Sequence, residues 1–362
     1  MKFAILSDLH VHDWQEHSTD RSRLHHGISV LQKVREYSIK NGISDVLFGG
    51  DLFHKRGLLY TLPYNLVVAE LAKWKAMDLD LKANVGNHDA ADRLAKIHAL
   101  TALESAGLLQ TVGNDGWADW TIDRGKVDIT AVAYCSEAAE LRRRTDAALE
   151  SREKLGHADV TIGLFHHGFR GARVGTSLEY LVKEDADADA YAKSFDVMFS
   201  GHYHAHQEIG TLGNAWYVGS PMEFVRGETS PKGFLVFDTE EMELERVTID
   251  LPRFVKLTGE EIADEDFDVR EHVKGNYVDV VFDELPLPWE SVEATLRKLG
   301  ALGIRACPTR DSNLPKSTRL QIDPTQGDRQ LLESYMEHVG VDPSERDDLL
   351  RTGLELLECV MK

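Results

Sequence analysis

The sequence predicts an α/β protein with more than one folding unit. Short apolar runs of strand length alternate with longer amphipathic segments near the N-terminus, a rhythm typical of strands joined by helices. The chain has 362 residues, of which 42% are hydrophobic, so it is long enough to bury a sizeable core and to form two or three units. It contains no run of about 18 apolar residues that would predict a membrane-spanning helix.

The N-terminal elements follow a β-α-β-α-β order. Strand-like runs occur at residues 3–8, 45–51 and 79–89, and helix-like segments at residues 25–42 and 62–77 separate them. This order predicts parallel strands with crossover helices.

Further strands follow without long helices between most of them, which indicates an antiparallel or mixed second sheet. A helix is predicted at residues 137–155, between the first two of these strands. The strands are predicted at residues 126–134, 159–167, 195–202, 215–220 and 233–239.

The acidic stretch 251–276 is poor in large apolar residues and indicates a domain boundary. After it, residues 277–310 have the pattern of a small β-α-β unit, and residues 329–339 and 343–361 have helical periodicity. We therefore expect three parts. They are a main domain at residues 1–255, a small α/β capping domain at residues 256–320 and a C-terminal helical hairpin at residues 321–362.

Charge and cysteine content limit the function classes. The formal net charge of −20 argues against a broad basic face that would hold nucleic acid alone. Cys135, Cys307 and Cys359 are far apart, so neither a disulfide framework nor a zinc ribbon is indicated. The N-terminus enters a polar motif too early for a secretory signal. These features predict a cytoplasmic protein with no membrane partner.

Side chains of the metal-binding type stand at the carboxyl ends of five predicted strands. Because loops converge at that edge of an open α/β sheet, these side chains are expected to form one site. Gly50, Gly86 and Gly201 each precede a proposed ligand, where a tight bend requires unusual backbone angles or close approach. The side chains are Asp8 with His10, Asp51, Asn87 with His88, His166 with His167, and His202 with His204.

This set of donors suits two divalent ions about 3.5–4 Å apart. Asp51 is the expected bridge between them, and Asp8 with His10 is expected to bind the first ion. The second ion is assigned to Asn87, His166 and His202, and His204 turns back towards the first. His167 is the alternative to His166. Aspartate and asparagine are also common where strands end, but their ordered recurrence after five strands favours metal binding.

The segments DLH, GGDLFH, VGNHD, LFHHG and GHYH resemble, in this order, the motifs of the calcineurin-like metallophosphoesterases. The resemblance implies a β-sandwich flanked by helices that holds a dinuclear centre, with Mn²⁺ as the expected ion and Mg²⁺ as the alternative. It also implies that His88 assists phosphoryl transfer without binding metal. The implied ligands are Asp8, His10, Asp51, Asn87, His166, His202 and His204.

Two segments resemble one branch of that family more closely. GDLFH is similar to the motif of SbcD-type DNA-repair nucleases, in which the last histidine helps to position DNA, and His54 matches it. Residues 217–239 resemble the strand pair that closes the nuclease domain, particularly in nuclease subunits of tailed-phage recombination complexes. The resemblance implies a metal-dependent exonuclease or endonuclease subunit of an SbcCD-like complex, acting on double-stranded ends or on single strands. The KRGLLY segment after His54 departs from the cellular members.

The two C-terminal helical segments carry apolar stripes that two short helices cannot bury fully against each other. By resemblance, this end docks on the coiled-coil root of an SbcC-like ABC-type ATPase. Whether two copies form a homodimer is left open. Two other functions remain: a small-molecule phosphodiesterase or phosphatase of the same fold, and a DNA-end-binding scaffold in which cleavage is secondary.

Overall fold

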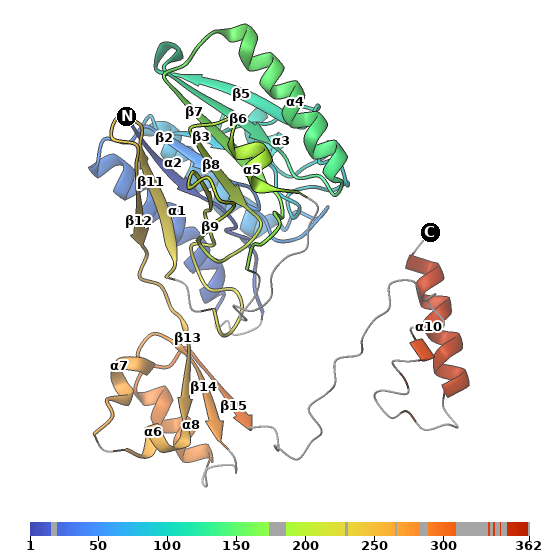
Figure 1. The fold of residues 1–362 in the computed structure, drawn as a ribbon. Coiled ribbons are helices and arrows are strands. Elements are labelled where there is room, and N and C mark those ends of the chain that lie inside the picture. Colours follow the sequence, from blue (N-terminus) through green and yellow to red (C-terminus); the bar gives the residue numbers. More distant parts are fainter. Residues whose placement is uncertain are drawn as a thin grey trace. The chain divides into compact units, whose positions relative to one another are not determined.

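The computed structural model divides the chain into two compact units, Met1–Cys307 and Pro308–Lys362. Figure 1 shows the fold. The structure describes residues 1–15, 20–173, 186–228, 231–264, 266–282, 289–308, 332–333, 336, 341 and 346–360.

A six-stranded sheet contains the N-terminal strands. Its order is β12-β11-β1-β2-β3-β4, in which β1 to β4 are parallel and β11 and β12 are antiparallel additions at one edge. Helices α1 (Ser22–Lys40) and α2 (Thr61–Ala76) connect its first three strands, which confirms the predicted crossover pattern. The short helix α3 (Thr101–Ser105) precedes β4. The strands are β1 (Lys2–Leu6), β2 (Asp45–Phe48), β3 (Asp80–Ala83), β4 (Gln110–Thr111), β11 (Gly233–Asp238) and β12 (Glu243–Thr248).

A second six-stranded sheet has the order β5-β6-β7-β8-β10-β9. Strands β6, β7, β8 and β10 are parallel, and β5 and β9 are antiparallel edges, so the sheet is mixed as predicted. The strands are β5 (Trp117–Ile122), β6 (Val127–Val132), β7 (Val160–His166), β8 (Val197–Gly201), β9 (Gln207–Glu208) and β10 (Ala215–Tyr217).

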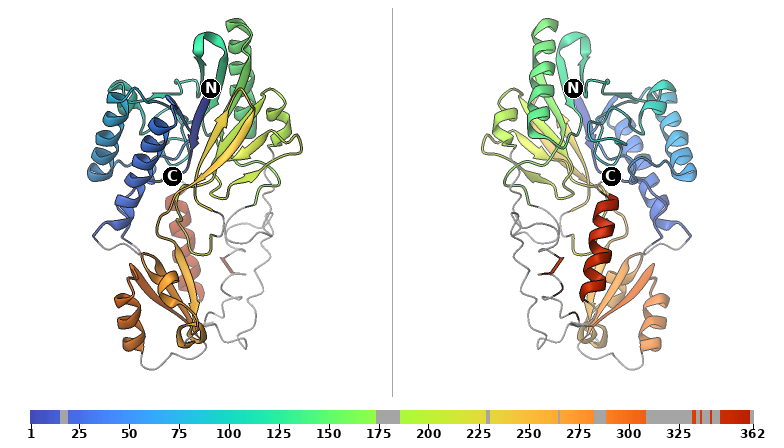
Figure 2. Two further views of the ribbon diagram at one scale, coloured as in Figure 1. Left: turned by 90° about the vertical axis from the view of Figure 1, so that its left-hand side faces the viewer. Right: turned by 90° about the vertical axis from the view of Figure 1, so that its right-hand side faces the viewer.

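The two sheets pack against each other because the second sheet is apolar on both faces. Ile162 of β7 and Phe199 of β8 join the core that also contains the first sheet, whereas their neighbours Phe165 and Met198 belong to a second core. Successive strand residues point to opposite faces, which explains the division. Leu141 of α4 (Ala138–Leu155) and residues of α5 (Ala188–Ala192) complete the second core. Figure 2 shows α1 and α2 on one side of the paired sheets and α4 and α5 on the other.

A third, three-stranded sheet of order β13-β14-β15 has its own small core. The interpretation of residues 251–276 as a boundary was incomplete, because β13 (Phe254–Thr258) lies inside it and pairs in parallel with β14 (Tyr277–Phe282). Most residues of β13 are half-buried or exposed, so the apolar pattern that would mark this strand in the sequence is weak. The remaining elements are α6 (Gly259–Ala263), α7 (Val269–Val273), α8 (Trp289–Lys298) and β15 (Gly303–Pro308).

The C-terminal unit contains α10 (Arg346–Val360), within the second predicted tail segment. The first tail segment, 329–339, lies outside the described residues except for positions 332, 333 and 336. A Cβ added at Gly353 would lie 3.1 Å from Leu332, so the two segments are in contact there. The division at residues 255 and 320 stays a prediction.

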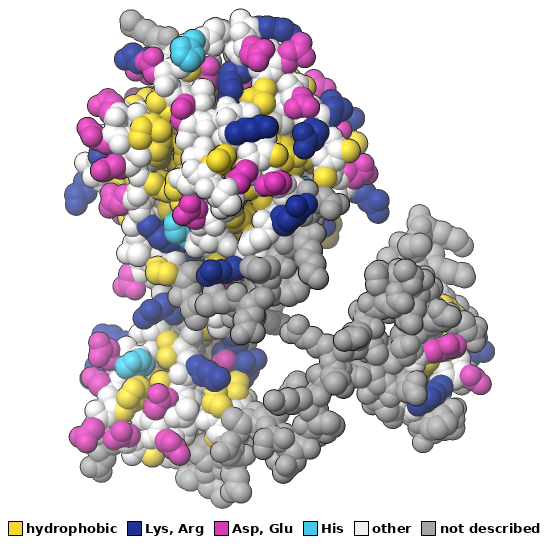
Figure 3. Space-filling view, viewed as in Figure 1, with side chains coloured by type: hydrophobic (Ala, Val, Ile, Leu, Met, Phe, Trp, Pro, Cys, Tyr) yellow, Lys and Arg dark blue, Asp and Glu magenta, His cyan; other side chains and the backbone are white. Residues whose placement is uncertain are grey.

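Acidic and basic side chains are interspersed over the face of the first unit shown in Figure 3. Among the described helices, none is both long and apolar enough to cross a membrane.

Candidate metal centre

The structure brings the predicted ligands together at the carboxyl ends of parallel strands from both sheets. Asp8 and Asp51 follow β1 and β2, Asn87 follows β3, and His166 ends β7. His202 follows β8 directly. The ligands that follow the first sheet, together with His166, are buried, whereas His202 and His204 are partly exposed. The site is therefore deep on one side and open on the other.

Asp8, His10 and His204 form one potential ligand group. Their donor atoms all lie within 4.8 Å of one another. The Nε2 atoms of His10 and His204 are 3.1 Å apart, and Nε2 of His10 is 3.7 Å from Oδ2 of Asp51. This is the grouping expected for the first ion, with Asp51 beside it.

A second group contains Asp8, Asp51 and His166, whose donor atoms also lie within 4.8 Å of one another. Nε2 of His166 is 3.4 Å from Oδ2 of Asp51. Oδ1 of Asn87 lies 3.1 Å from this Nε2 and 3.0 Å from Nδ1 of His202. Oδ2 of Asp51 is thus close to both groups, as a bridging carboxylate must be. Asp8 also belongs to both groups, although the spacing assigned it to the first ion alone.

His166, and not His167, is the histidine that faces the carboxylates. Its Nδ1 donates to the Gly49 carbonyl oxygen over 2.7 Å, which leaves Nε2 as the donor atom in the site. The ring of His167 packs against Phe169, with ring centroids 5.7 Å apart, and His167 belongs to none of the potential ligand groups among the described residues. The ligand role of His166 stays a prediction that this orientation favours.

The glycines before the ligands allow an unusual backbone angle at one position and a close approach of neighbouring groups at two others, as predicted. Gly50 has a φ of 102°, which an L-residue rarely adopts. A Cβ at Gly86 would collide with the backbone and carboxylate of Asp51, and one at Gly201 would lie 2.6 Å from Nδ1 of His166. The absence of side chains at these positions lets the ligands approach one another.

Burial and mutual charge fix the protonation of the buried ligands. Burial alone would raise the pKa of Asp51, but His166 and its hydrogen bond hold that pKa far below its usual range. Burial alone would lower the pKa of His166, but the Asp51 carboxylate and its hydrogen bond, with Asp8, raise it to about 9. Burial lowers the pKa of His202 to about 3 and that of His10 well below 6.5. Two imidazoles are thus neutral and ready to bind metal.

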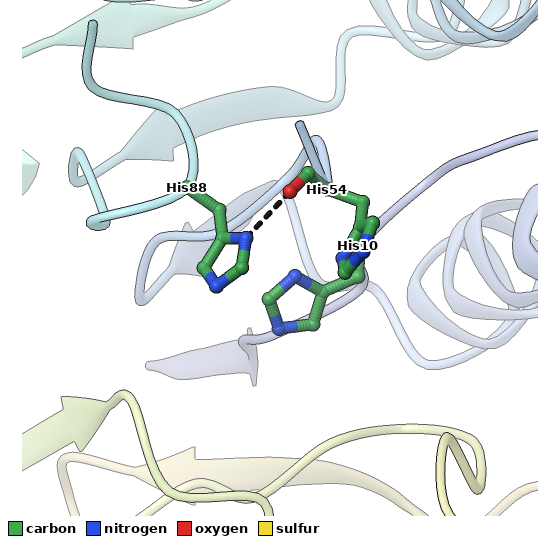
Figure 4. Close-up of side chains that lie close together, drawn as sticks. All are labelled: His10, His54 and His88. Atoms are coloured by element: carbon green, nitrogen blue, oxygen red, sulfur yellow. Dashed lines mark hydrogen bonds between the residues drawn. The ribbon is translucent and has the colours of Figure 1, made fainter. Parts of the chain in front are cut away.

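His54 and His88 stand beside His10 at the open side of the centre (Figure 4). Nδ1 of His88 donates to the backbone oxygen of His54 over 2.5 Å, and the two rings are stacked with centroids 5.2 Å apart. The donor nitrogens of His10, His54 and His88 lie within 4.8 Å of one another. By distance alone these three side chains are a further potential ligand group, so the expected non-ligand roles of His54 and His88 stay predictions.

Asp89 is a structural residue of the site that the sequence reasoning did not assign. Its Oδ2 accepts from the backbone N–H of Asp51 and of Gly86, over 2.7 and 3.2 Å, and its Oδ1 accepts from the N–H of Phe53 over 3.0 Å. Burial and the Asp51 charge raise the pKa of Asp89 to about 7. The only signal in the sequence was its place at the end of VGNHD.

The residues present fit a pair of divalent metal ions. Among the described residues, buried carboxylate oxygens, an amide oxygen and imidazole nitrogens converge, and this mixed set suits first-row divalent metals. The identity of the metal stays a prediction.

Comparison with known proteins gave one family model and a set of solved structures that includes the following two. The model of the calcineurin-like phosphoesterase family matches residues 1–206, which contain all the predicted ligands. A dimetal phosphatase from Danio rerio is 10% identical, with a TM-score of 0.41 over 65% of this chain and 91% of that chain. A second solved structure is 14% identical, with a TM-score of 0.43 over 69% of this chain and 99% of the other. No curated protein matched the chain.

Proposed function

The chain belongs to the calcineurin-like phosphoesterase family, and we propose that it is a metal-dependent DNA nuclease acting at or near DNA ends. The family makes it a metal-dependent phosphoester hydrolase. DNA as the substrate is the part that we propose. The observation that carries it is the position of His54, the residue that resembles the DNA-positioning histidine of SbcD-type nucleases, directly beside His88 and His10.

The carboxylates and imidazoles would hold the two ions. Asp51 would contact both, Asp8 and His10 with His204 would bind one, and Asn87, His166 and His202 would bind the other. Bound there, two divalent ions supply the Lewis acidity that polarises a phosphoester and activates water at neutral pH. The fixed loops keep the ligands in place before substrate arrives, so no reorganisation is needed during the reaction.

His88 is suited to transfer a proton to the leaving oxygen. Its Nδ1–H is held by the His54 carbonyl oxygen, so Nε2 is the nitrogen left to face a phosphoester. The residue is partly exposed, which a group that meets substrate requires. A histidine is suited to this step because the imidazolium form carries a second proton on Nε2, which it can give to the leaving oxygen while Nδ1–H stays bound to His54.

We also propose an SbcC-like ABC-type ATPase as the partner, docked on the C-terminal unit. An acidic chain needs another source of positive surface to hold DNA, and such an ATPase would provide it. Leu349 of α10 is 49% exposed, whereas its neighbour Leu350 is 6% exposed. The exposed leucine supports docking on that side of α10.

A small-molecule phosphodiesterase or phosphatase is the second candidate. The net charge of −20 favours it, because a small phosphoester needs no extended basic surface. The same metal ligands serve both substrates, so the loops and the small third sheet decide between them.

The test is cleavage of end-labelled duplex and single-stranded DNA by the purified full chain in Mn²⁺. We expect degradation by the wild type and none by Asp51→Asn, which loses the bridging carboxylate. His88→Ala is expected to keep the wild-type metal content and to slow cleavage by about 10²–10⁴-fold.

Three outcomes contradict parts of this proposal. Undiminished cleavage by Asp51→Asn would show that the activity is a contaminant or uses another site. Equal loss of metal from His88→Ala would make His88 a ligand. Rapid hydrolysis of cyclic nucleotides, with DNA left intact even when the ATPase is present, would establish the small-molecule function.

A further inference from the structure

His204 differs from the other predicted ligands in how its ring is held. The His166 ring is fully buried and fixed by the Gly49 carbonyl oxygen, and the His202 backbone N–H donates to Asp8. The side chain of His204 is 30% exposed and lies beyond the strand end. A partly exposed imidazole on a loop needs a partner on its second nitrogen if the first is to point steadily into a metal site.

That partner is a buried carboxylate. Nε2 of His204 faces His10 and the metal-binding group, whereas Nδ1 lies 3.7 Å from Oε1 of Glu228. The Glu228 side chain is 6% exposed. The 3.7 Å separation is longer than a hydrogen bond, and a carboxylate this close to the outer nitrogen favours the tautomer that carries its proton on Nδ1 and leaves Nε2 free for a metal.

Glu228 is itself held in place by a buried lysine. Nζ of Lys232 lies 2.5 Å from Oε2 of Glu228, and the Lys232 side chain is 5% exposed. The same Nζ donates to Oγ of Ser220 over 2.9 Å and to the backbone oxygen of His204 over 3.3 Å. Lys232 therefore binds both the main chain of His204 and the carboxylate that faces its ring. A buried charge pair with additional hydrogen bonds in this arrangement is rigid.

We propose that Glu228 is a positioning residue for His204, and that Lys232 holds Glu228 in the orientation this requires. The inference rests on the metal centre of the proposed function but concerns residues outside the predicted ligand set. It applies to either substrate class, because it concerns metal binding and not the group that is hydrolysed. Glu228 and Lys232 lie beyond residues 1–206, the part that matches the family model.

The test is titration of the metal-free full chain with Mn²⁺ by calorimetry, together with thermal unfolding of the metal-free protein. We expect the wild type to bind two ions. Glu228→Gln keeps the size of the side chain but removes its charge, and it should weaken one of the two ions by about 10–100-fold and leave the other nearly unchanged. Glu243→Gln, an exposed acidic residue of β12, is the matched control and should bind both ions normally.

A double variant distinguishes a role of Glu228 in positioning His204 from a role only as the counter-charge of Lys232. Glu228→Gln leaves Lys232 buried without a counter-charge, so it should also lower the unfolding temperature. Glu228→Gln with Lys232→Met removes both charges, and it should recover unfolding temperature without recovering metal affinity.

Each contrary result has its own meaning. Wild-type affinities for both ions in Glu228→Gln would overturn the positioning role. Recovered affinity in the double variant would also overturn it, because Glu228 would then act only as the counter-charge of Lys232. A wild-type chain that binds no ions would overturn the metal centre, and with it both the proposed function and this inference.

Discussion

Several predicted ligands have backbone conformations that L-residues rarely adopt. Asp8, His10, Asp51 and His202 have φ values of 55°, 47°, 62° and 98°. Such conformations cost of order 1–3 kcal/mol each and persist only where the surrounding structure enforces them. Their concentration at one edge of the sheets means that the fold holds these side chains in a strained arrangement before any ion arrives.

The charge state of His166 leads to a prediction on pH. Its pKa is raised from 6.5 to about 9 by Asp51, so this histidine stabilises the metal-free fold fully below about pH 6.5 and loses that contribution as pH rises towards 9. A histidine must be neutral to bind metal, so metal affinity should rise over the same range while the metal-free protein becomes less stable. His10 and His202 have lowered pKa values and release no proton there.

Calorimetry of Mn²⁺ binding at pH 7.5, in buffers with different ionisation enthalpies, measures the protons released. We expect about one proton in the wild type and in His167→Gln, the control for loss of a neighbouring imidazole. His166→Gln should release none. Equal proton release from His166→Gln would show that another group carries the charge.

At the scale of elements, the loops after β2 and β3 are held together because the Asp89 carboxylate accepts hydrogen bonds from both of them. Asp89 accepts backbone hydrogen bonds from both loops, at Asp51, Phe53 and Gly86. All three partners are donors, so only a side chain with acceptor oxygens on both sides satisfies them. The position of the bridging Asp51 therefore depends on Asp89, which contacts it through the backbone alone.

Asp89→Asn should both destabilise the fold and weaken metal binding. The amide places a donor against a backbone donor, which should cost about 1–3 kcal/mol in the free energy of unfolding, measured by urea denaturation of the metal-free protein. The Mn²⁺ affinity should fall as the Asp51 loop loosens.

Asp92→Asn is a suitable control, because Asp92 also accepts backbone N–H groups, from Leu94 and Ile97, but is absent from the predicted ligand groups. It should change stability without changing metal affinity. An Asp89→Asn variant with unchanged affinity would refute the coupling between the two loops.

The parallel strands of the two six-stranded sheets other than β4, with the helices α1, α2 and α4, were predictable from the sequence because burial on both faces leaves apolar runs bounded by polar motifs. The strand-end position of the ligands was predictable for the same reason. The short edge strands β4 and β9 were not, because two-residue strands have no periodicity to detect. Asp89 and Glu228 could not be assigned either, since their roles depend on contacts with backbone or imidazole groups that only the fold brings near.

At the scale of the whole molecule, the proposed chemistry and the proposed partner binding fall in different units. The predicted metal ligands all lie within the unit Met1–Cys307, and α10 lies in the unit Pro308–Lys362. A chain with a net charge of −20 repels DNA, so the DNA cleavage that we propose would depend on the ATPase that we propose as partner, whereas hydrolysis of a small ester would not.

Truncation after Cys307 should therefore leave metal binding and phosphodiester hydrolysis intact and abolish association with the proposed ATPase. We expect residues 1–307 to bind two Mn²⁺ ions and to hydrolyse bis(p-nitrophenyl) phosphate at close to the rate of the full chain, because no predicted ligand is removed. Association with a coiled-coil ABC-type ATPase, measured by co-purification and calorimetry, should be lost. Full-length Leu349→Asp, altered at an exposed leucine of α10, should lose the same association with metal binding intact. ATPase association by residues 1–307 would place the docking surface in the first unit, and loss of metal from that truncated chain would mean that the C-terminal unit supports the centre itself.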